Sequence, residues 1–324
     1  MKKIGIIASG GNSQAMNNTV IAIVKQAYKN NLEPYLIKDG YCGVLRGDFK
    51  KAVAADLDAY INRGNVMIGS ARCLEFLEPK NQEKAAGILK KNGIEVLIVI
   101  GGDGSYNGAY KLSTFGTKVI ALPGTIDNDI SSTEYSIGFD TCLNQIILNM
   151  DALKDSFESH NGICFVEVMG RHFSELAIRA CIANNAQYVV TSDNVLNAKQ
   201  FAKIANDATK NGVRGVMFVI TENIYGKDGL PTLSAIAEEV GKLTNNQMSR
   251  AISLGHIQRG GTPTANDRFM SSLFGAHAIT CIKENVTNVA IGFRNNKLVT
   301  VDIKKAVTMP RKKHCFYFFD KSTI

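Results

Sequence analysis

Short runs of apolar, mostly β-branched residues alternate along this chain with longer stretches that mix apolar and polar positions. The short runs are continuously apolar, which is typical of strands in a parallel sheet that helices cover on both faces. Strands are expected at 4–8, 96–100, 119–122, 164–168, 188–191, 216–220, 252–254 and 289–293. Helices are expected between them, at 16–29, 82–92, 141–157, 174–183, 198–210, 233–243 and 268–283.

This alternation predicts an α/β fold with doubly wound (Rossmann-like), mostly parallel sheets in three layers. Glycines follow several of the predicted strands, at Gly10, Gly101, Gly124 and Gly170. Ligands of open α/β sheets bind beyond the carboxyl ends of the strands, and glycine lets the backbone approach them closely. We therefore expect the binding residues at these strand ends.

The composition is that of an ordinary soluble globular protein, with 45% apolar and 20% charged residues, and a length of 324 residues suits about two domains. The longest aliphatic run, 96–100, is far shorter than the roughly twenty residues that cross a bilayer. The basic start of the chain, 1–3, is not followed by the apolar core of a signal peptide. The sequence thus predicts a cytoplasmic protein without a membrane segment.

The net charge of +8, from 37 Lys and Arg against 29 Asp and Glu, suits anionic partners such as nucleotides, sugar phosphates or nucleic acid. Nucleic acid is not expected, because the sequence has no basic stripe interleaved with aromatic residues and no recognition motif. Residues 311–314 are interpreted as a solvated charge run ahead of a packed segment at 315–319. The seven cysteines form no Cys-x-x-Cys pair, and the histidines do not lie near them in ligand spacing, which predicts free thiols in a reducing compartment rather than a zinc site.

The segment 101–105, Gly-Gly-Asp-Gly-Ser, follows the most apolar predicted strand. Its glycines permit main-chain N–H groups to bind phosphate oxygens, and a helix start behind them favours anions. Because a carboxylate among phosphates needs an intervening cation, Asp103 is a candidate ligand of nucleotide-bound Mg²⁺. A tight turn with a surface aspartate is the alternative interpretation.

The segment 123–129, Pro-Gly-Thr-Ile-Asp-Asn-Asp, follows the next predicted strand. An alcohol that attacks phosphorus must lose its proton, and Asp127 is the candidate base. Thr125 is a candidate for orienting the alcohol or the transferring phosphoryl group. The alternative is an Asx turn, in which the Asp and Asn side chains cap local backbone groups.

Arginines follow two further turns of the sequence. Arg171 ends the segment 167–171, and Arg72 comes after the turn at 69–71. A guanidinium fork matches the charge that spreads over the oxygens of a transferring phosphoryl group. The alternative for each arginine is an ordinary surface ion pair.

The segment 255–261, Gly-His-Ile-Gln-Arg-Gly-Gly, brings His256 and Arg259 to another predicted strand end. This combination suits a phosphorylated or polyhydroxylated substrate, although His256 can also be interpreted as a core histidine. Glu222 follows the predicted strand at 216–220 and can accept hydrogen bonds from sugar hydroxyls.

Taken together, these blocks resemble the 6-phosphofructokinases, specifically the short bacterial ATP-dependent type. The resemblance covers residues 4 to about 302, and its most specific parts are 101–105, 123–129, 168–171 and 255–261. It implies two similar α/β domains with the active site in the cleft between them, and a homotetramer. The ATP-binding domain would comprise 1–138 and about 258–310, and the sugar-phosphate domain 139–257 and about 311–324.

The resemblance also implies a role for individual residues. ATP would contact Gly11, Arg72, Cys73, Gly102, Asp103, Gly104 and Ser105, with Mg²⁺ at Asp103. Fructose 6-phosphate would contact Thr125, Ile126, Asp127, Met169, Gly170, Arg171, Glu222, His256 and Arg259, and Arg250 would reach its phosphate from a neighbouring subunit. Asp127 would be the base that activates the 1-hydroxyl, with Thr125, Arg171 and Arg72 as the other catalytic residues.

Two glycines bear on the phosphoryl donor. Pyrophosphate-dependent relatives typically carry Asp at the position of Gly104 and Lys at the position of Gly124. Side chains there would fill space that a nucleotide needs and would add contacts suited to a short diphosphate. The two glycines therefore favour ATP over pyrophosphate.

The chain departs from the family pattern at several positions. Gly162 stands where the family usually has an arginine that holds the sugar phosphate across a subunit contact, a loss worth about 1.5–3 kcal/mol if nothing compensates. The positions of the allosteric effector site read Ile21, Lys25, Ala54, Lys154, Gln187, Val213 and Arg214. Only Lys25, Lys154 and Arg214 remain basic, which predicts weak or absent regulation by a nucleoside diphosphate or phosphoenolpyruvate.

Two more departures keep an alternative open. The opening motif, 10–16, is looser than the family pattern, and Asn184-Asn185 replaces a usual Gly-Gly. These changes permit a non-catalytic phosphofructokinase-like subunit. The intact Asp103, Thr125, Asp127 and Arg171 argue against it. NAD kinase shares the Gly-Gly-Asp-Gly loop but does not explain 125–129 or 256–259.

Overall fold

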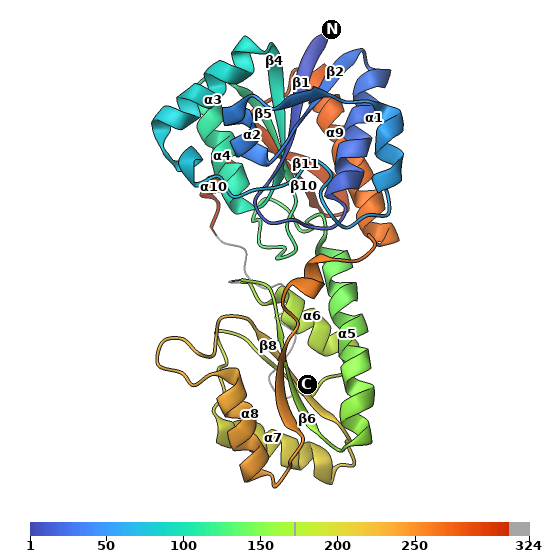
Figure 1. The fold of residues 1–324 in the computed structure, drawn as a ribbon, viewed down its shortest axis with the longest axis vertical. Coiled ribbons are helices and arrows are strands. Elements are labelled where there is room, and N and C mark those ends of the chain that lie inside the picture. The colour runs from blue at the N-terminus through green and yellow to red at the C-terminus, as the bar shows by residue number, and fades with distance from the viewer. Residues whose placement is uncertain (172, 311–324) are drawn as a thin grey trace. The chain divides into compact units, whose positions relative to one another are not determined.

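The computed structural model describes residues 1–171 and 173–310 (Figure 1). They form two compact units, one made of Met1–Thr141 and the described residues from Arg259 onward, the other of Cys142–Gln258. The boundaries expected from the sequence were 138/139 and near 257/258, and the assignment of ATP and sugar phosphate to the two domains stays a prediction. The charge run at 311–314 and the predicted C-terminal part of the second domain lie outside the described residues.

Unit 1 is built on a sheet whose described strands follow the order β11-β10-β5-β4-β1-β2-β3. Their bounds are β1 (Lys2–Ser9), β2 (Leu32–Ile37), β3 (Phe49–Lys51), β4 (Ile94–Gly101), β5 (Lys118–Pro123), β10 (Val289–Arg294) and β11 (Lys297–Asp302). The edge strands β3 and β11 run antiparallel to their neighbours, and the others are parallel. The chain winds outward from β1 through β2 and returns on the other side through β4, so the carboxyl ends of β1 and β4 form a topological switch point, where open α/β sheets bind ligands.

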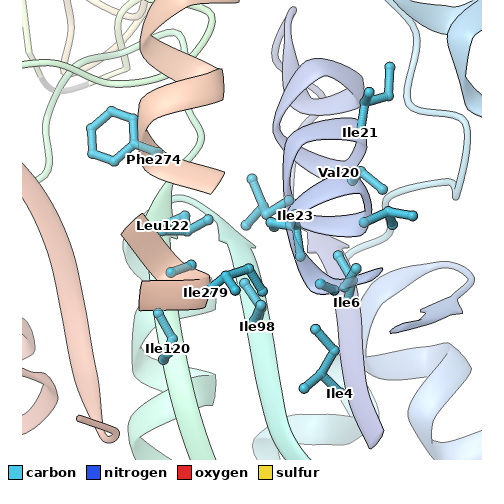
Figure 2. Packing of buried hydrophobic residues seen from close by; sticks show 14 of the residues in the cluster. Ile4, Ile6, Val20, Ile21, Ile23, Ile98, Ile120, Leu122, Phe274 and Ile279 are labelled. Atoms are coloured by element: carbon cyan, nitrogen blue, oxygen red, sulfur yellow. The ribbon is translucent and has the colours of Figure 1, made fainter. Parts of the chain in front are cut away.

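Helices cover both faces of this sheet. Their bounds are α1 (Met16–Lys29), α2 (Gly40–Arg46), α3 (Pro79–Lys91), α4 (Asp103–Thr114), α9 (Ala265–Lys283) and α10 (Ile303–Thr308), with the 3₁₀ turns η1 (Ala54–Tyr60) and η2 (Leu74–Leu77). On one face, Ile4, Ile6 and Ile98 of the strands pack against α1 and α9 (Figure 2). On the other face, Ile7 and Val99 pack against α2, α3 and α4. Burial on both faces is the reason that these strands are continuously apolar.

Unit 2 has a smaller, parallel sheet with the strand order β7-β8-β6-β9. Its elements are α5 (Phe139–Ser159), β6 (Ile163–Val168), α6 (Glu175–Asn184), β7 (Tyr188–Val190), α7 (Ala198–Lys210), β8 (Val216–Thr221), α8 (Leu233–Leu243), β9 (Ser249–Ser253) and η3 (Gly255–Arg259), of which α5 and η3 cross the unit boundary. Phe201 of α7 packs edge-on against Phe165 of β6 and Phe218 of β8, with ring centroids 5.0 and 4.9 Å apart. Aromatic pairs at such separations add about 0.5–1.5 kcal/mol each beyond their burial.

The predicted class, α/β with mostly parallel sheets, is confirmed, and every strand and helix that the sequence analysis expected is present. Strand β2, where Glu33 and Pro34 interrupt the apolar run, was not expected from the sequence, and neither were the short or edge strands β3 and β11. Strand β9 begins earlier than the expected 252–254, because its pairing with β6 starts at Ser249. None of the described helices has both the length and the apolar character needed to cross a bilayer.

Candidate active site

Three neighbouring strands of unit 1, β5, β4 and β1, end side by side and bring the predicted nucleotide residues together. The backbone N–H of Gly124 donates to the carbonyl of Gly101 at 3.0 Å, which ties the end of β5 to that of β4. A Cβ placed on Gly102 would lie 3.6 Å from Cβ of Thr125. The glycine loop after β4 and the threonine after β5 are therefore direct neighbours, although they are far apart in the predicted motifs.

The loop after β4 is shaped by Ser105. Its hydroxyl donates to the carbonyl of Ser9 at 3.0 Å, and a Cβ on Gly101 would lie 2.4 Å from that hydroxyl oxygen. Only glycine fits at this position without moving Ser105. Helix α4 begins directly behind, and its N-cap, Gly102, has no side chain to cap the N–H groups of the first turn. Such a helix start is suited to phosphate oxygens, because its N–H groups and its dipole both favour an anion.

Thr125 and Asp127 interact with each other at the end of β5. The hydroxyl of Thr125 donates to Oδ2 of Asp127 at 3.4 Å and accepts the backbone N–H of Asp127 at 3.2 Å. Asp127 is 7% exposed, so its carboxylate is largely shielded from water but still reachable. Ile126 between them is fully buried and anchors the turn. The side chain of Asp127 faces the threonine hydroxyl, and the Asx turn weighed as an alternative stays open for this segment.

Arg72 and Cys73 lie beside the end of β1. Ser9 and Ala71 form a parallel bridge, the N–H of Gly10 donates to the carbonyl of Ala71 at 3.3 Å, and the hydroxyl of Ser70 donates to the carbonyl of Gly10 at 2.8 Å. Arg72 follows this bridged segment and is exposed. The structure thus brings Arg72 and Cys73 to the same sheet edge as Gly10.

Arg259 also lies at this edge, against the loop after β1. Its Nη1 donates to the carbonyl of Asn12 at 2.8 Å, and a Cβ on Gly11 would lie 3.1 Å from the same nitrogen. The side chains of Asn12 and Gln14 donate in turn to the carbonyls of Arg259 and Gly260, at 3.1 and 2.7 Å. The opening motif that looked loose in sequence therefore has a structural role, because its polar side chains hold the 259–260 segment.

In unit 2, the predicted sugar residues follow β8, β6 and β9, which are neighbours in the sheet. The carboxylate of Glu222 accepts the backbone N–H groups of Gly170 and Arg171 through Oε1, at 3.2 and 2.8 Å. Arg171 has a left-handed backbone with φ of 58°, a conformation that a non-glycine residue adopts only when its surroundings hold it. Glu222 thus positions Arg171, in addition to the hydroxyl-accepting role that the sequence suggested.

The segment after β9 is held by a buried amide. Gln258 is fully buried, its Oε1 accepts the N–H of Met169 at 3.0 Å, and its Nε2 donates to the carbonyl of Gly255 at 2.9 Å. His256, on η3 between these contacts, is exposed, so the core-histidine alternative is wrong. Residues 169–171, 222 and 256 therefore share one edge of the sheet in unit 2.

Arg250 does not belong to that edge. It is the second residue of β9 and pairs in register with Cys164 near the start of β6, so it lies toward the amino ends of the strands. Its guanidinium donates to the carbonyls of Gln247 and Ser249 at 3.1 and 2.9 Å, and a cavity of about 350 Å³ lies beside it. The structure thus separates Arg250 from the other predicted sugar residues of unit 2. Its predicted reach into a neighbouring subunit stays a prediction.

Gly162 lies at the same amino end, and the structure leaves no room there for a side chain. A Cβ on Gly162 would lie 2.7 Å from Cδ1 of Phe157 and 2.9 Å from the carbonyl oxygen of Met248. The backbone is fixed on both sides, because the N–H of Gly162 donates to the carbonyl of Phe157 and its carbonyl accepts the N–H of Val216. The arginine of the family pattern could not be restored here by one substitution.

Gly162→Ala is therefore expected to destabilise the protein by about 1–3 kcal/mol, because the new methyl group meets a backbone oxygen that cannot move away. Gly162→Arg should be at least as destabilising and should not improve affinity for fructose 6-phosphate. Chemical denaturation measures the first effect and sugar saturation curves the second. The control is Gly87→Ala in α3, where no described atom lies within 4 Å of the added Cβ. A stable Gly162→Arg variant with tighter sugar binding would contradict this expectation.

The basic residues that remain at the predicted effector positions are engaged within the chain. Lys25 pairs with Asp58 at 2.6 Å, Nζ of Lys154 donates to the carbonyl of Asn184 at 3.1 Å, and Nε of Arg214 donates to that of Glu158 at 3.3 Å. Three of the replaced positions now contribute apolar packing: Ile21, Ala54 and Val213. Gln187 accepts the N–H of Met217 at 2.6 Å. At the other departure, Asn185 takes the left-handed C-cap of α6, a conformation that glycine most often supplies.

The structure adds residues that the motifs did not single out. The hydroxyl of Tyr41 in α2 donates to the carbonyl of Ser105 at 2.6 Å, and burial holds the pKa of this phenol well above its usual range. Together with Ser70 and Gln258, Tyr41 fixes loops that carry candidate functional residues. Gln258 lay inside a recognised motif, whereas nothing in the local sequence marks Tyr41.

The chain that carries these loops matches a known protein family. The family model for phosphofructokinase matches residues 3–282 of the chain. The chain belongs to the phosphofructokinase family. ATP-dependent 6-phosphofructokinase of Mycoplasmopsis pulmonis is 40% identical over 314 residues, which are 97% of this chain and 94% of that protein. ATP-dependent 6-phosphofructokinase 1 of Clostridium perfringens is 39% identical over 311 residues, 96% of this chain and 95% of that protein.

Solved phosphofructokinase structures share the fold. The crystal structure of Pichia pastoris phosphofructokinase in the T-state superimposes with a TM-score of 0.85 at 31% identity, covering 94% of this chain, which spans only 37% of the Pichia chain. A pyrophosphate-dependent phosphofructokinase from Marinobacter aquaeolei gives a TM-score of 0.83 at 17% identity over 99% of this chain and 87% of its own. The resemblance stated from the sequence is thereby confirmed.

Proposed function

We propose that this phosphofructokinase-family protein transfers the γ-phosphoryl group of ATP to the 1-hydroxyl of fructose 6-phosphate. The observation that carries the proposal is the Thr125–Asp127 pair, which lies beside the glycine loop and the uncapped start of α4. A phosphate site next to a shielded carboxylate is what phosphoryl transfer to an alcohol requires. Bacterial relatives that match nearly the whole chain are ATP-dependent 6-phosphofructokinases.

In this mechanism Asp127 accepts the proton of the sugar 1-hydroxyl as that oxygen attacks the γ-phosphorus. The hydroxyl of Thr125, which already contacts Oδ2 of Asp127, orients the carboxylate and the incoming alcohol. The guanidinium groups of Arg72 and Arg171 supply positive charge to the oxygens of the transferring group. Most of the rate enhancement comes from such positioning and electrostatic stabilisation, since phosphoryl transfer needs little covalent chemistry from the protein.

Asp103 is the residue that would hold Mg²⁺. It is the first residue of α4, exposed and adjacent to the phosphate-binding loop. Among the described residues, no cluster of three or more His, Cys, Asp or Glu side chains could hold a metal on its own. This fits Mg²⁺, which proteins usually bind through one or two carboxylates together with substrate phosphates and water. When bound, the ion would neutralise charge on the phosphate oxygens.

The geometry around the two donor-specific glycines supports ATP. No described atom lies within 4 Å of a Cβ built on Gly104, so this side of the loop is open for a nucleotide. A Cβ on Gly124 would lie 2.9 Å from Cε of Met16 and Cγ2 of Ile100, so a lysine there would require local repacking. The chain thus lacks both side chains that suit a pyrophosphate donor.

Gly104→Asp is expected to raise the KM for ATP by about ten- to a hundredfold, because the new carboxylate would face the phosphates of the donor. The melting temperature should stay close to that of the parent protein, since the position is open. Gly104→Ala is the matched control: it adds a small uncharged group and should raise the KM for ATP far less than the Asp variant, with no appreciable change in melting temperature. An unchanged KM in the Asp variant would mean that the phosphates of ATP lie elsewhere.

The remaining parts of the proposal rest on the sequence. Regulation by a nucleoside diphosphate or phosphoenolpyruvate is expected to be weak or absent, since Lys25, Lys154 and Arg214 are already engaged within the chain. A homotetramer, a cytoplasmic location and the absence of nucleic-acid binding stay predictions.

The deciding experiment measures fructose 1,6-bisphosphate formed by purified protein from fructose 6-phosphate and Mg²⁺, with ATP or pyrophosphate as donor. We expect product to form with ATP as donor and not with pyrophosphate. Product formed with pyrophosphate and not with ATP would overturn the donor assignment. A folded protein that binds ATP but turns over neither donor would be a non-catalytic family member.

A further inference from the structure

Three hydrogen bonds connect the loop after β1 to the residues with which the chain enters unit 1 again after unit 2. The side chains of Asn12 and Gln14 donate to the carbonyls of Arg259 and Gly260, at 3.1 and 2.7 Å. Nη1 of Arg259 donates back to the carbonyl of Asn12 at 2.8 Å. We call these three bonds the latch. Gln14 is fully buried and Asn12 is half-buried, so water does not readily replace their bonds.

The guanidinium group that the latch holds lies against Gly11. A Cβ on Gly11 would lie 3.1, 3.5 and 3.6 Å from Nη1, Cζ and Nη2 of Arg259. The backbone of Gly11 does not have the positive φ that favours glycine elsewhere in this chain. A side chain at this position would press on the guanidinium group, so the glycine leaves space for Arg259. The latch and the bare backbone of Gly11 together set the position of this cation.

The loop that carries the latch is strained. Ala15 has a left-handed backbone with φ of 67°, a conformation that alanine adopts only where its surroundings hold it. Ala15 is fully buried, and the hydroxyl of Ser271 in α9 donates to its carbonyl at 3.2 Å. Strained residues of this kind cluster at functional sites. Gln14 directly precedes Ala15, so it lies in a segment whose geometry is fixed more tightly than a connecting loop requires.

The turn that follows Arg259 is also held from another side. A Cβ on Gly64 would lie 2.2 Å from the carbonyl oxygen of Gly261, so the two backbones are in contact there. Asn17 is fully buried, and its Nδ2 donates to the carbonyl of Asn65 at 2.8 Å, which fixes the segment next to Gly64. Loss of the latch should therefore release Arg259 without unfolding the turn behind it.

The nucleotide side of the loop after β1 has its own support. The N–H of Gly10 donates to the carbonyl of Ala71 at 3.3 Å, and the hydroxyl of Ser70 donates to the carbonyl of Gly10 at 2.8 Å. These bonds involve neither Asn12 nor Gln14. The end of β1 and the glycine loop after β4 should therefore keep their positions when the latch is removed.

We propose that Asn12 and Gln14 are positioning residues that set the affinity for the sugar phosphate by holding the guanidinium group of Arg259. The proposal rests on the function proposed above, in which Arg259 contacts fructose 6-phosphate. It assigns the latch to one substrate, so affinity for the sugar depends on it and affinity for ATP does not. A guanidinium group that is held in place before binding loses less side-chain freedom on binding, which favours the complex. Both residues lie in the segment 10–16, which departs from the family pattern, so this role belongs to the present chain.

The first experiment removes the latch and compares the two substrates. Gln14→Met keeps most of the side-chain volume but cannot donate to Gly260, and Asn12→Ala removes the other side-chain bond at a half-buried position that tolerates the change. We expect the half-saturation for fructose 6-phosphate to rise about five- to tenfold in each variant, as the loss of one hydrogen bond allows. The KM for ATP should stay within about twofold of the parent value, because the nucleotide side is supported separately.

The matched control is Gln82→Met in α3. It removes another buried amide of the same unit, whose Nε2 donates to the carbonyl of Phe76 at 2.9 Å. This variant should lose stability without a change in the half-saturation for the sugar. Folded Gln14→Met and Asn12→Ala proteins with the parent half-saturation would contradict the proposal. So would equal increases for the sugar and for ATP, since they would indicate a general distortion of the site.

The second experiment tests whether Gln14 acts through Arg259. The half-saturation for fructose 6-phosphate is measured for the parent, Gln14→Met, Arg259→Ala and the double variant. We expect Gln14→Met to have little further effect once the guanidinium group is absent, because the two changes then remove the same interaction. Effects that multiply in the double variant would mean that Gln14 supports the fold in general, and the proposal would be wrong.

The parent protein separates this inference from the function on which it rests. A parent that neither binds nor phosphorylates fructose 6-phosphate would overturn the proposed function and the role of the latch together. Normal turnover by the parent with unaffected latch variants would overturn the role of the latch alone.

Discussion

Asp127→Asn is expected to lower kcat for phosphoryl transfer by about 10²–10⁴-fold, the range in which a general base contributes to catalysis. Asparagine has nearly the shape of aspartate and keeps an oxygen that can accept the hydroxyl of Thr125, but it cannot take the proton of the sugar. Because Asp127 is 7% exposed, bulk water cannot easily replace it as the base. The KM for ATP should change little, since the phosphates are assigned to the glycine loop and the start of α4.

A coupled assay of fructose 1,6-bisphosphate formation measures this loss. The control is Asp56→Asn, which removes one exposed carboxylate of the same unit at η1 and should leave kcat unchanged. ATP binding by the Asp127 variant shows that the protein is folded. If that variant retained nearly full turnover, another group would have to accept the proton, and the assignment of Asp127 as base would be wrong.

The sequence predicted the parts of this site that depend on regular topology. Residues after β1, β4 and β5 come together because the carboxyl ends of neighbouring parallel strands share an edge, so the order of motifs and strands was enough to group Gly11, Asp103 and Asp127. The buried strands were recognisable because both of their faces are apolar. Edge strands such as β11 and interrupted strands such as β2 carry no such signal.

Contacts between irregular segments could not be predicted in the same way. The stacking of Tyr41 on Phe76 depends on the path of the chain between α2 and η2 and on no local pattern. Gly162 is a second example, because from the sequence it was interpreted only as the loss of an arginine that the family usually has there. Only the packing of Phe157 and Met248 shows that a side chain at this position has no space.

Asp267 illustrates a residue whose importance is visible only in three dimensions. It lies in the first turn of α9, is fully buried, and belongs to none of the segments that identified the family. Its two carboxylate oxygens accept hydrogen bonds from the hydroxyl of Tyr135 at 2.5 Å, the N–H of Gly138 at 2.8 Å, and both the N–H and the hydroxyl of Thr141 at 2.8 and 2.5 Å. Burial raises the pKa of this carboxyl, and the donated hydrogen bonds oppose that shift. One side chain thus holds the segment that leads from the Asp127 loop into α5.

Asp267→Ala is therefore expected to lower the free energy of unfolding by about 3–4 kcal/mol, since it leaves the N–H groups of Gly138 and Thr141 without their acceptor at about 1–3 kcal/mol each. Tyr135→Phe removes only one of the four donors and should cost about 1 kcal/mol. Urea denaturation of both variants measures the difference, and equal losses would mean that water replaces the carboxylate.

Because the Asp127 loop is anchored through the same segment, kcat of Asp267→Ala should also fall even where the protein is fully folded. A variant that lost stability but kept its parent kcat would show that the turn at Thr125 and Asp127 holds its own geometry, independent of the segment that follows it.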